Sequence, residues 1–596
     1  MKRDIDKLDV LFVNAMYFLD EDNINIGQFI LRDILKNEYK VECLNFDYLN
    51  KTGEIKYKDS YDDNIELMGE YLIKKDAKIL AFYTICDAFV YSLGIAKYVK
   101  DKNPQIKVIF GGPHASTIKE QCLKQFDFID IVSYGESEKS FKSLIDELLG
   151  KNNLSKVDGI VYRNDGGITV NKPAKLLLAS ELDNYVVEDF SPFKIDKNAI
   201  IDIEGGRGCP FNCTFCTTSI FWERNFRVKP VEDIIKEMKR YNDIFGVTKF
   251  SIIHDMFTAN KRHIINFCQL LIEENLGFEW YCSSRIDVLD TELVGMLRDA
   301  NCTKIFIGIE SGSERMQKIL NKNLKLQDAY KMINYIKSKG IDVTISFVYG
   351  FKDEKVEDFK ETIKMIEHFL KMGVKTIQLH KFMPLPNTVE TNKIKDIMYF
   401  DRDNLDSTFN TIKNDSKIVE YIEKYPECFS QYYTFNSEVR NIYCYFDIFV
   451  AGMTLFNKNY NLCLRYIIDK IGIEKVFFDI KDVLPRWKKI IVEMISNTRE
   501  SRKVTIIDIV KEDVLKYIEK KKDEPEIKYV KDLMLYCDYK YRYLKGDVDK
   551  ESIVKFGINI GTVIKKNEFI EEEYYIKFSK KNNKVCIENI KKSEIY

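Results

Sequence analysis

Residues 199–219 read AIIDIEGGRGCPFNCTFCTTS, which places Cys209, Cys213 and Cys216 in a glycine-rich loop directly after an apolar strand. Thiolates are the usual protein ligands of iron–sulfur clusters, and this close spacing lets one short loop hold three corners of a cubane. The glycines before the first cysteine relax the backbone, so that its N–H groups can approach the sulfides. Three ligands leave one iron open for a chelating molecule. The loop therefore predicts a [4Fe–4S] cluster.

Zinc is the alternative metal for the same loop. A structural zinc site has four ligands, and neither a second cysteine pair nor a histidine lies nearby in the sequence. The other cysteines outside the central region form no motif for a second cluster. Those of the N-terminal part are too scattered, namely Cys43, Cys86 and Cys122. Those of the C-terminal region are widely spaced, and we expect them to be buried thiols: Cys428, Cys444, Cys463, Cys537 and Cys586.

A series of strands and helices begins at the cysteine loop. The candidate strands are 200–204, 249–255, 279–285, 304–310, 342–350 and 376–382. Amphipathic segments such as 231–245 and 328–340 lie between them and are typical of helices. This pattern predicts a partial (βα)6 TIM-type barrel, in which chemistry takes place at the carboxyl ends of the strands.

The region before the loop also alternates strand and helix. Apolar strands are expected at 8–15, 41–46, 77–85 and 107–115, with helices at 27–37 and 92–103. Short buried strands separated by helices predict a doubly wound parallel sheet, which binds ligands at the carboxyl ends of its strands. The candidate residues at those ends are Thr84, Gly111, Gly112, Gly135 and Glu136.

The chain is α/β and divides into four predicted parts. Residues 1–150 form the first sheet domain, 151–195 a linker with a hairpin at 159–171, and 196–395 the barrel. Residues 396–596 are mainly helical, are rich in aromatic residues and end in a hairpin at 573–590. We expect this last part to cover the barrel mouth and to shape a substrate pocket.

Composition limits the classes of function. A chain of 596 residues is too long for one hydrophobic core, and its formal net charge of −1 argues against a nucleic-acid partner. There is no long apolar run for a membrane span and no signal peptide, so we expect a cytoplasmic protein whose fourteen cysteines are thiols or metal ligands. Five histidines are few for a histidine-built zinc or haem enzyme.

The segment CPFNCTFC resembles the signature of the radical S-adenosylmethionine (SAM) superfamily, with Phe215 as the aromatic residue before the last cysteine. The resemblance covers about 196–395, and later family motifs follow in order. They are HDMFTAN (254–260), CSSRID (282–287), FIGIESGSERMQKILNK (306–322), FVYGFKDE (347–354) and MPLPNT (383–388). The last two depart from the family pattern, because Phe351 and Lys352 replace Leu and Pro, and Asn387 replaces Gly.

The resemblance implies a mechanism. SAM chelates the open iron, and an electron from the reduced cluster breaks its C5′–S bond to give a 5′-deoxyadenosyl radical. A flavodoxin- or ferredoxin-type protein is the implied electron donor. By motif position, Phe215, Asp255, Arg285 and Glu310 contact the cofactor. The alternative for Arg285 and Glu310 is a salt bridge across the barrel mouth.

FGGPHAS (110–116) and YGESE (134–138) resemble the cobalamin-binding domain that precedes many radical SAM enzymes. The resemblance implies a corrin on the strand ends near Thr84, Gly111, Gly112, Gly135 and Glu136, with its nucleotide tail beside the sheet. The Asp-x-His-x-x-Gly loop of the classical domains is absent, and we expect His114 to be a loop-packing residue rather than a cobalt ligand. The alternative that this domain is a scaffold and binds no corrin stays open.

The implied function is a cobalamin-dependent radical SAM enzyme that methylates an unactivated carbon. Two alternatives stay open: a rearrangement, cyclisation or ring-forming oxidation on the same two domains, and a cluster-containing sensor that reports cobalamin. The barrel motifs argue against a sensor, which needs no cofactor-cleaving barrel. The substrate is a small molecule or a peptide, and a lipid also stays open.

Overall fold

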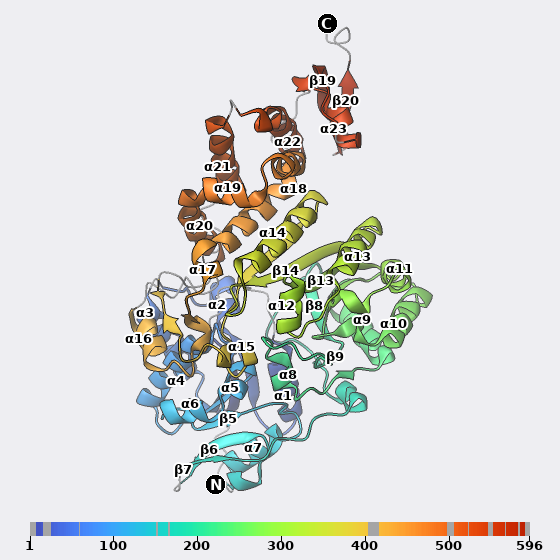
Figure 1. Cartoon of the computed structure of the whole chain (residues 1–596). Helices are drawn as coiled ribbons and strands as arrows, with labels where there is room; N and C mark the ends of the chain where they lie inside the picture. The colour runs from blue at the N-terminus through green and yellow to red at the C-terminus, as the bar shows by residue number, and fades with distance from the viewer. Residues whose placement is uncertain are drawn as a thin grey trace.

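The computed structural model describes residues 7–15, 25–58, 60–150, 153–164, 167–402, 416–496, 506–521, 524–545, 552–566, 568–581 and 584–590. In Figure 1 the blue N-terminal part and the green barrel lie next to each other, and the orange helices of the C-terminal region rise from the barrel. Among the helices in these ranges, none is long and apolar enough to cross a lipid bilayer.

Five parallel strands form the N-terminal sheet in the order β2-β1-β3-β4-β5, so the chain winds from β1 toward both edges. The doubly wound parallel sheet is confirmed. The strand expected over 107–115 ends earlier, because Gly112 has a φ of +90° and helix α5 (Pro113–Ile118) follows it. The strands are β1 (Leu8–Asn14), β2 (Val41–Asn45), β3 (Ala77–Tyr83), β4 (Lys107–Gly111) and β5 (Ile131–Ser133).

Helices cover both faces of this sheet because successive side chains of a strand point to opposite sides. Phe12 of β1 joins a core with α1 (Ile26–Leu35) and α7 (Phe141–Leu149). Val13, its neighbour, joins the opposite core with α3 (Tyr61–Lys74) and α4 (Phe89–Lys102). Because both faces of the sheet are buried, most residues of its strands are apolar.

The predicted hairpin is part of the N-terminal sheet. Strand β6 (Ile160–Asn164) pairs antiparallel with β5, and β7 (Gly167–Val170) pairs antiparallel with β6. The hairpin thus extends the sheet to seven strands and covers the edge that β5 would expose. The linker expected over 151–195 therefore begins with elements of the first domain.

The second sheet has six parallel strands in the order β15-β14-β13-β12-β11-β8. Its outer strands β8 and β15 do not pair with each other in the described residues, so the barrel is partial, as predicted. Helix α9 (Val231–Phe245) matches the predicted helix, and α13 (Leu326–Ser338) is shifted by two residues. The strands are β8 (Ile200–Glu204), β11 (Lys249–Ile253), β12 (Glu279–Ser284), β13 (Cys302–Glu310), β14 (Asp342–Tyr349) and β15 (Thr376–Lys381).

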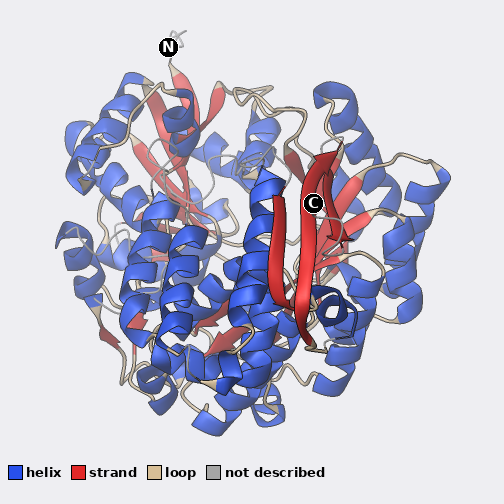
Figure 2. Ribbon diagram, turned by 90° about the horizontal axis from the view of Figure 1, so that it is seen from above, coloured by secondary structure: helices blue, strands red, loops and turns tan. Residues whose placement is uncertain are grey.

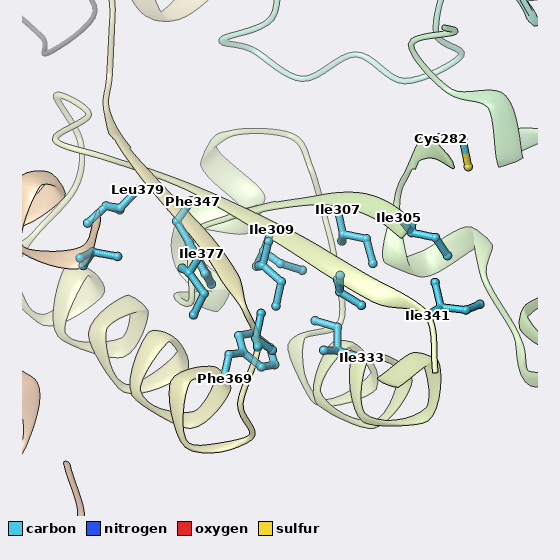
Figure 3. Close-up of a cluster of buried hydrophobic side chains, with 14 of the residues drawn as sticks. Cys282, Ile305, Ile307, Ile309, Ile333, Ile341, Phe347, Phe369, Ile377 and Leu379 are labelled. Atoms are coloured by element: carbon cyan, nitrogen blue, oxygen red, sulfur yellow. The ribbon is translucent and has the colours of Figure 1, made fainter. Parts of the chain in front are cut away.

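The barrel core lies between its strands and the outer helices. Figure 3 shows the row Ile305, Ile307 and Ile309 of β13 directed toward Ile333 of α13 and Phe369 of α14 (Val356–Lys371). All five side chains are fully buried. A fully buried branched or aromatic side chain contributes about 1.5–3 kcal/mol, so this layer supports the strand ends that carry the site.

The C-terminal region stacks helices on the outer side of β15. Helix α18 (Phe446–Lys470) packs against α14 and β15, and α22 (Val530–Lys545) packs against α18. The predicted final hairpin is confirmed as β19 (Glu571–Lys581) and β20 (Lys584–Ile590), and β18 (Ser552–Ile558) adds a third antiparallel strand. Figure 2 shows this small sheet as long red arrows, and Figure 1 shows it far from the N-terminal domain.

The beginning of the C-terminal region returns to the N-terminal domain. Lys417 of α16 (Ser416–Lys424) forms an ion pair of 2.5 Å with Asp62, and the Cys428 carbonyl oxygen lies 3.0 Å from Nε2 of His114. His114 is buried, and burial lowers its pKa to about 4. His114 is therefore a packing residue, as expected, although it lies in α5 and packs against the segment around Cys428.

Arg440 of the C-terminal region fastens the loops after β14 and β15. Its guanidinium donates to the carbonyl oxygens of Gly350 (2.7 Å) and Phe382, and it lies 4.2 Å from the ring centroid of Phe435. Asn387, which replaces the family glycine, keeps a left-handed φ of +65°, a conformation that asparagine tolerates. The departures from the family motifs therefore leave both turns in left-handed backbone conformations, with Gly350 at a φ of +79°.

The buried Glu354, in the loop after β14, should make the free energy of unfolding depend on pH. Burial raises the pKa of its carboxyl to about 8, and the backbone hydrogen bonds from Gly350 and Phe351 only partly oppose this effect. The pKa of glutamate in an unfolded chain is about 4.3. Between about pH 4.3 and pH 8 the folded chain therefore binds one more proton than the unfolded chain, and its stability falls as pH rises. Glu354→Gln should reduce the loss between pH 5 and pH 8 by about 1–2 kcal/mol.

The measurement is the free energy of unfolding at pH 5, 6.5 and 8 for wild type and Glu354→Gln. The exposed Glu357, in the first turn of α14, supplies the matched control Glu357→Gln, which should keep the wild-type slope. Equal slopes for wild type and Glu354→Gln would contradict the prediction.

Candidate active site

The cysteine loop is closed by a short antiparallel pair. Strand β9 (Gly206–Arg207) pairs with β10 (Arg227–Val228), so the chain leaves β8, carries the three cysteines and returns. Gly208 has a φ of +82°, and a Cβ there would lie 1.9 Å from the Asn225 carbonyl oxygen. Only glycine fits at this position, immediately before the first cysteine.

Loops from two other barrel strands hold the cysteine loop from outside. The Thr214 N–H donates to the Leu320 carbonyl oxygen (3.0 Å), and the Glu390 N–H donates to the Thr214 carbonyl oxygen (3.3 Å). Asn321 donates to the Asn212 carbonyl oxygen (2.8 Å). The loops after β13 and β15 therefore fix the segment between Cys209 and Cys216.

The donor set fits an iron–sulfur cubane. Cys209, Cys213 and Cys216 are half-buried free thiols on one loop. Among the described residues, no three His, Cys, Asp or Glu side chains converge on a point where a single metal ion could bind. A cubane does not need such convergence, because each thiolate binds a different iron.

The electrostatics of the loop depend on two nearby cations. Burial raises the pKa of Cys209 to about 11 and also raises that of Cys213. The charges of Lys322 and Arg285 oppose the effect at Cys213, and the Arg285 guanidinium lies 3.7 Å from its Sγ. Metal binding must displace the thiol protons, and these cations stabilise the thiolates that result.

Arg285 and Glu310 do not pair with each other, so the predicted alternative of a salt bridge between them is wrong. Arg285 makes two hydrogen bonds to Asp287 (3.0 and 2.9 Å) and stacks on Phe211 at 3.8 Å from the ring centroid. Glu310 forms an ion pair with Nζ of Lys322 (2.6 Å).

Lys322 joins the two predicted cofactor contacts, and the sequence reasoning missed it. Its carbonyl oxygen accepts a hydrogen bond from Arg285 (2.6 Å) while its ammonium pairs with Glu310. Lys322 is the last residue of the predicted fourth-strand motif and lies twelve residues after Glu310. Its burial shows that it belongs to the site rather than to the surface.

Glu310 occupies a strained backbone position. Its φ is +67°, and the pairing of β13 with β14 shifts register between Gly308 and Glu310. A positive φ is costly for a residue other than Gly, Asn or Asp, and such residues cluster at functional sites. The bulge turns the Glu310 carboxylate toward Lys322 at the barrel mouth.

Gly308→Ala should disturb this pair. A Cβ on Gly308 would lie 2.3 Å from Oε1 of Glu310 and 2.9 Å from Nζ of Lys322. We expect SAM to bind about tenfold more weakly and the chain to lose about 1–3 kcal/mol of stability. Gly295→Ala in α11 (Thr291–Asp299) is the control, because in the part of the chain that the structure describes no atom lies within 4 Å of its Cβ position. Unchanged SAM affinity, measured by equilibrium dialysis, would contradict the prediction.

Asp255 contacts the helix after the cysteine loop, and Phe215 lies within the loop. Thr218 donates to Asp255 (3.2 Å), whose carboxylate is exposed. The Phe215 ring is half-buried and lies 6.0 Å from that of Phe351, the residue that replaces the family leucine. Both therefore stay predicted contacts to the cofactor.

A cavity of about 390 Å³ lies between the strand ends of the two sheets. Its lining includes four of the residues predicted at the strand ends, which follow or end β4 and β5: Gly111, Gly112, Gly135 and Glu136. From the barrel side it is lined by Asp202, Glu204, Arg207, Phe221, Trp222 and Ile253. The cavity continues beside the sheet, where Phe12, Ala81 and Ile109 face Gly27, Ile30, Leu31 and Phe141. This interdomain cavity therefore has a polar mouth and an apolar slot.

Thr84 does not line the interdomain cavity. Its side chain is fully buried, its hydroxyl donates to the Gly111 carbonyl oxygen (2.7 Å), and the Ala115 N–H donates to it (3.1 Å). Thr84 thus fastens the end of β3 to the turn before α5. A Cβ on Gly112 would lie 2.8 Å from the Thr84 carbonyl oxygen, so this turn also requires glycine.

A network of buried charges crosses the mouth of the interdomain cavity. Arg207 lies 2.7 Å from both Glu138 and Glu204 and 3.4 Å from Glu136, and Arg227 lies 2.5 Å from Glu136. Burial alone would raise the pKa of Glu136, but the Arg227 hydrogen bond and the Arg207 charge hold it below its usual range. The network ties the cysteine loop to the N-terminal domain.

A second cavity, of about 380 Å³, lies on the other side of Gly135. It shares Gly135 and Phe221 with the interdomain cavity, and the rest of its lining comes from α5, α6 (Glu120–Gln125) and several other segments, among them Asn387. Asn387 also donates to the Thr117 carbonyl oxygen (2.8 Å), a contact between barrel and N-terminal domain that glycine cannot make.

Residues 203–366 match the family model described as the Radical SAM superfamily. This segment is therefore a radical SAM domain. An uncharacterized methyltransferase of Pyrococcus horikoshii is 28% identical over 323 residues, 53% of this chain and 69% of that protein. The anaerobic magnesium-protoporphyrin IX monomethyl ester cyclase of Rubrivivax gelatinosus is 28% identical over 278 residues, 45% of this chain and 50% of that protein. The chain thus spans about half to about seven tenths of these curated relatives.

Two solved radical SAM structures share the fold. TsrM from Kitasatospora setae, solved with tryptophan substrate and a SAM analog, aligns with a TM-score of 0.55 at 14% identity, over 70% of this chain and 82% of that one. OxsB, solved with aqua-cobalamin, aligns with a TM-score of 0.52 at 15% identity, over 91% of this chain and 81% of that one. The likeness to OxsB extends through the N-terminal sheet, the barrel and most of the C-terminal region.

Proposed function

We propose that this radical SAM protein is a cobalamin-dependent enzyme that methylates an unactivated carbon. The observation that carries the proposal is the interdomain cavity, which joins the cysteine loop side of the barrel to the glycine-rich strand ends of a doubly wound sheet. Solved relatives of this fold are described as binding cobalamin, a [4Fe–4S] cluster and SAM or its analog. When bound here, these groups would supply a 5′-deoxyadenosyl radical and a transferable methyl group.

The residues of the barrel would hold the cluster and SAM. Cys209, Cys213 and Cys216 would bind three irons, and the charges of Arg285 and Lys322 would stabilise the thiolates. The Glu310 carboxylate, which pairs with Lys322, would accept hydrogen bonds from SAM. The barrel would hold these groups in place before the cofactors bind, and a preorganised site favours radical chemistry shielded from water.

The interdomain cavity suits the parts of a cobalamin. Its apolar slot beside the sheet would take the aromatic base of the nucleotide tail. Gly135 has a φ of +72°, and no atom of the described residues lies within 4 Å of its Cβ position, so the corrin could approach the backbone there. Among the described residues no histidine lines the cavity, and we propose that the protein does not ligate the cobalt through an imidazole.

A ring-forming oxidation is the second candidate reaction. Its specific support is the 28% identity to the Rubrivivax gelatinosus cyclase, which covers half of that enzyme. The same barrel and N-terminal sheet would serve either reaction, and the products distinguish them. Methyl transfer yields a product that gains the methyl group, whereas ring closure conserves the substrate carbons.

The remaining assignments concern location and partners. We propose a cytoplasmic enzyme that receives electrons from a flavodoxin- or ferredoxin-type protein and acts on a small molecule or a peptide, not on nucleic acid. The second cavity, open beside Gly135, is the proposed route of the substrate to the interdomain cavity.

The test is an anaerobic assay of protein reconstituted with iron, sulfide and hydroxocobalamin. We expect about four irons per chain, bound corrin absorbance after desalting, and 5′-deoxyadenosine after addition of dithionite and SAM. Absence of 5′-deoxyadenosine from cluster-containing protein would refute the radical SAM activity. Absence of corrin absorbance would refute the cobalamin assignment separately.

A further inference from the structure

Trp222 stands between the two proposed cofactor sites. It follows α8 (Thr218–Phe221), the short helix that begins two residues after the last cysteine, and it lines the interdomain cavity. Burial raises the pKa of the Asp255 carboxyl, and the Trp222 side chain opposes this effect. The Cβ of Trp222 lies 3.4 Å from the Cβ position of Gly208. One side chain therefore touches the cavity, the cysteine loop and a predicted SAM contact.

The charges of the network hold this indole in place. The guanidinium of Arg207 lies 5.7 Å from the ring centroid of Trp222, and that of Arg227 lies 5.8 Å from it. Phe221 packs edge-on at 4.7 Å. Both arginines also bind Glu136 of the N-terminal domain. A movement of Glu136 would therefore shift the two guanidinium groups, and these in turn contact the indole.

We propose that Trp222 is a positioning residue that couples cobalamin binding in the interdomain cavity to SAM binding at Asp255. This inference rests on the proposed function, because it presupposes both cofactors. A corrin in the cavity would press on the indole face and fix its orientation. The fixed indole would then hold Asp255 in its SAM-binding position, so each cofactor raises the affinity for the other.

Fluorescence gives a readout that does not need turnover. The chain has three tryptophans, and Trp280 and Trp487 are fully buried, whereas Trp222 is half-buried at the cavity. In cluster-free protein, acrylamide should quench Trp222 selectively, and hydroxocobalamin should protect it. Trp222→Phe should lose the quenchable component. Quenching that is insensitive to hydroxocobalamin in protein that binds corrin would overturn the inference.

The coupling is measured as the ratio of SAM dissociation constants without and with hydroxocobalamin, in protein that carries its cluster. We expect a ratio of about five or more in wild type, in the usual range for coupled sites, and a ratio near one in Trp222→Phe. Trp487→Phe, in the C-terminal helices, should keep the wild-type ratio. A ratio of one in wild type, or an unchanged ratio in Trp222→Phe, overturns the inference.

These results separate the inference from the proposed function. If both cofactors bind and 5′-deoxyadenosine forms but the ratio is one, the coupling fails and the function stands. If neither cofactor binds to the reconstituted protein, the function fails and the coupling fails with it. Loss of folding in Trp222→Phe is checked by its thermal midpoint, and Trp222→Tyr, which keeps a large ring, should then restore part of the ratio.

Discussion

Replacing Cys213 by alanine should reduce 5′-deoxyadenosine formation to below about a thousandth of the wild-type rate. Two remaining thiolates cannot hold a four-iron cubane with a defined open iron. Cys213 is also the thiol that lies 3.7 Å from the Arg285 guanidinium, so its loss separates the cluster from the nearest cation. The effect should be on cluster binding rather than on folding, because the loop is closed by β9–β10 pairing and not by the cysteines.

Three measurements check this prediction on the same samples: iron content, the electron paramagnetic resonance signal of the reduced cluster, and 5′-deoxyadenosine. Cys586→Ala in β20 is the matched control and should match wild type in all three. The thermal midpoint of apo Cys213→Ala should stay within a few degrees of that of the wild-type apoprotein. Cys213→Ala protein with about four irons and normal activity would contradict the assignment of this thiol.

Much of the fold could be predicted from the sequence, because local sequence patterns indicate its strands and helices. Six apolar strands with intervening amphipathic segments were enough to predict the barrel, and β8 has the predicted bounds. The cysteine loop was predictable because its ligands and glycines are adjacent in sequence. Cys428, Cys463 and Cys537 are buried as expected, whereas Cys444 and Cys586 are half-buried.

Contacts between distant segments could not be predicted in this way. The pair Glu136–Arg227 joins residues 91 apart, and the contact of His114 with Cys428 joins residues 314 apart. Neither has a periodic signal. The role of Thr84 shows a second limit, since a strand end can be located from sequence but the direction of its side chain cannot. Lys322 was missed because lysines are usually exposed, and only its pairing with Glu310 explains its burial.

Arg207→Met should lower the free energy of unfolding by about 3–5 kcal/mol at pH 8. The Arg207 side chain is only 5% exposed and is the cation that Glu138 and Glu204 share. Methionine fills a similar volume without charge, so the variant leaves three carboxylates around one remaining arginine. Uncompensated buried charge is the dominant cost of breaking such a network.

The pH dependence identifies the cause. In Arg207→Met the buried carboxylates lose a cation that offsets their negative charge, so the variant should be less stable at pH 8 than at pH 5. In wild type the pKa of Glu136 is held low, so its stabilisation is present above the unfolded value and is lost as pH falls. Both effects make the difference in free energy of unfolding between wild type and Arg207→Met smaller at pH 5 than at pH 8.

Two further variants complete the test by chemical denaturation. Arg207→Lys keeps the charge but loses the planar fork, and its cost should be intermediate. Arg298→Met, at an exposed arginine of α11, should change stability by less than about 0.5 kcal/mol. A cost of Arg207→Met that does not vary between pH 5 and pH 8 would mean that Arg207 acts through packing. The cysteine loop and the N-terminal domain would then be joined by shape and not by charge.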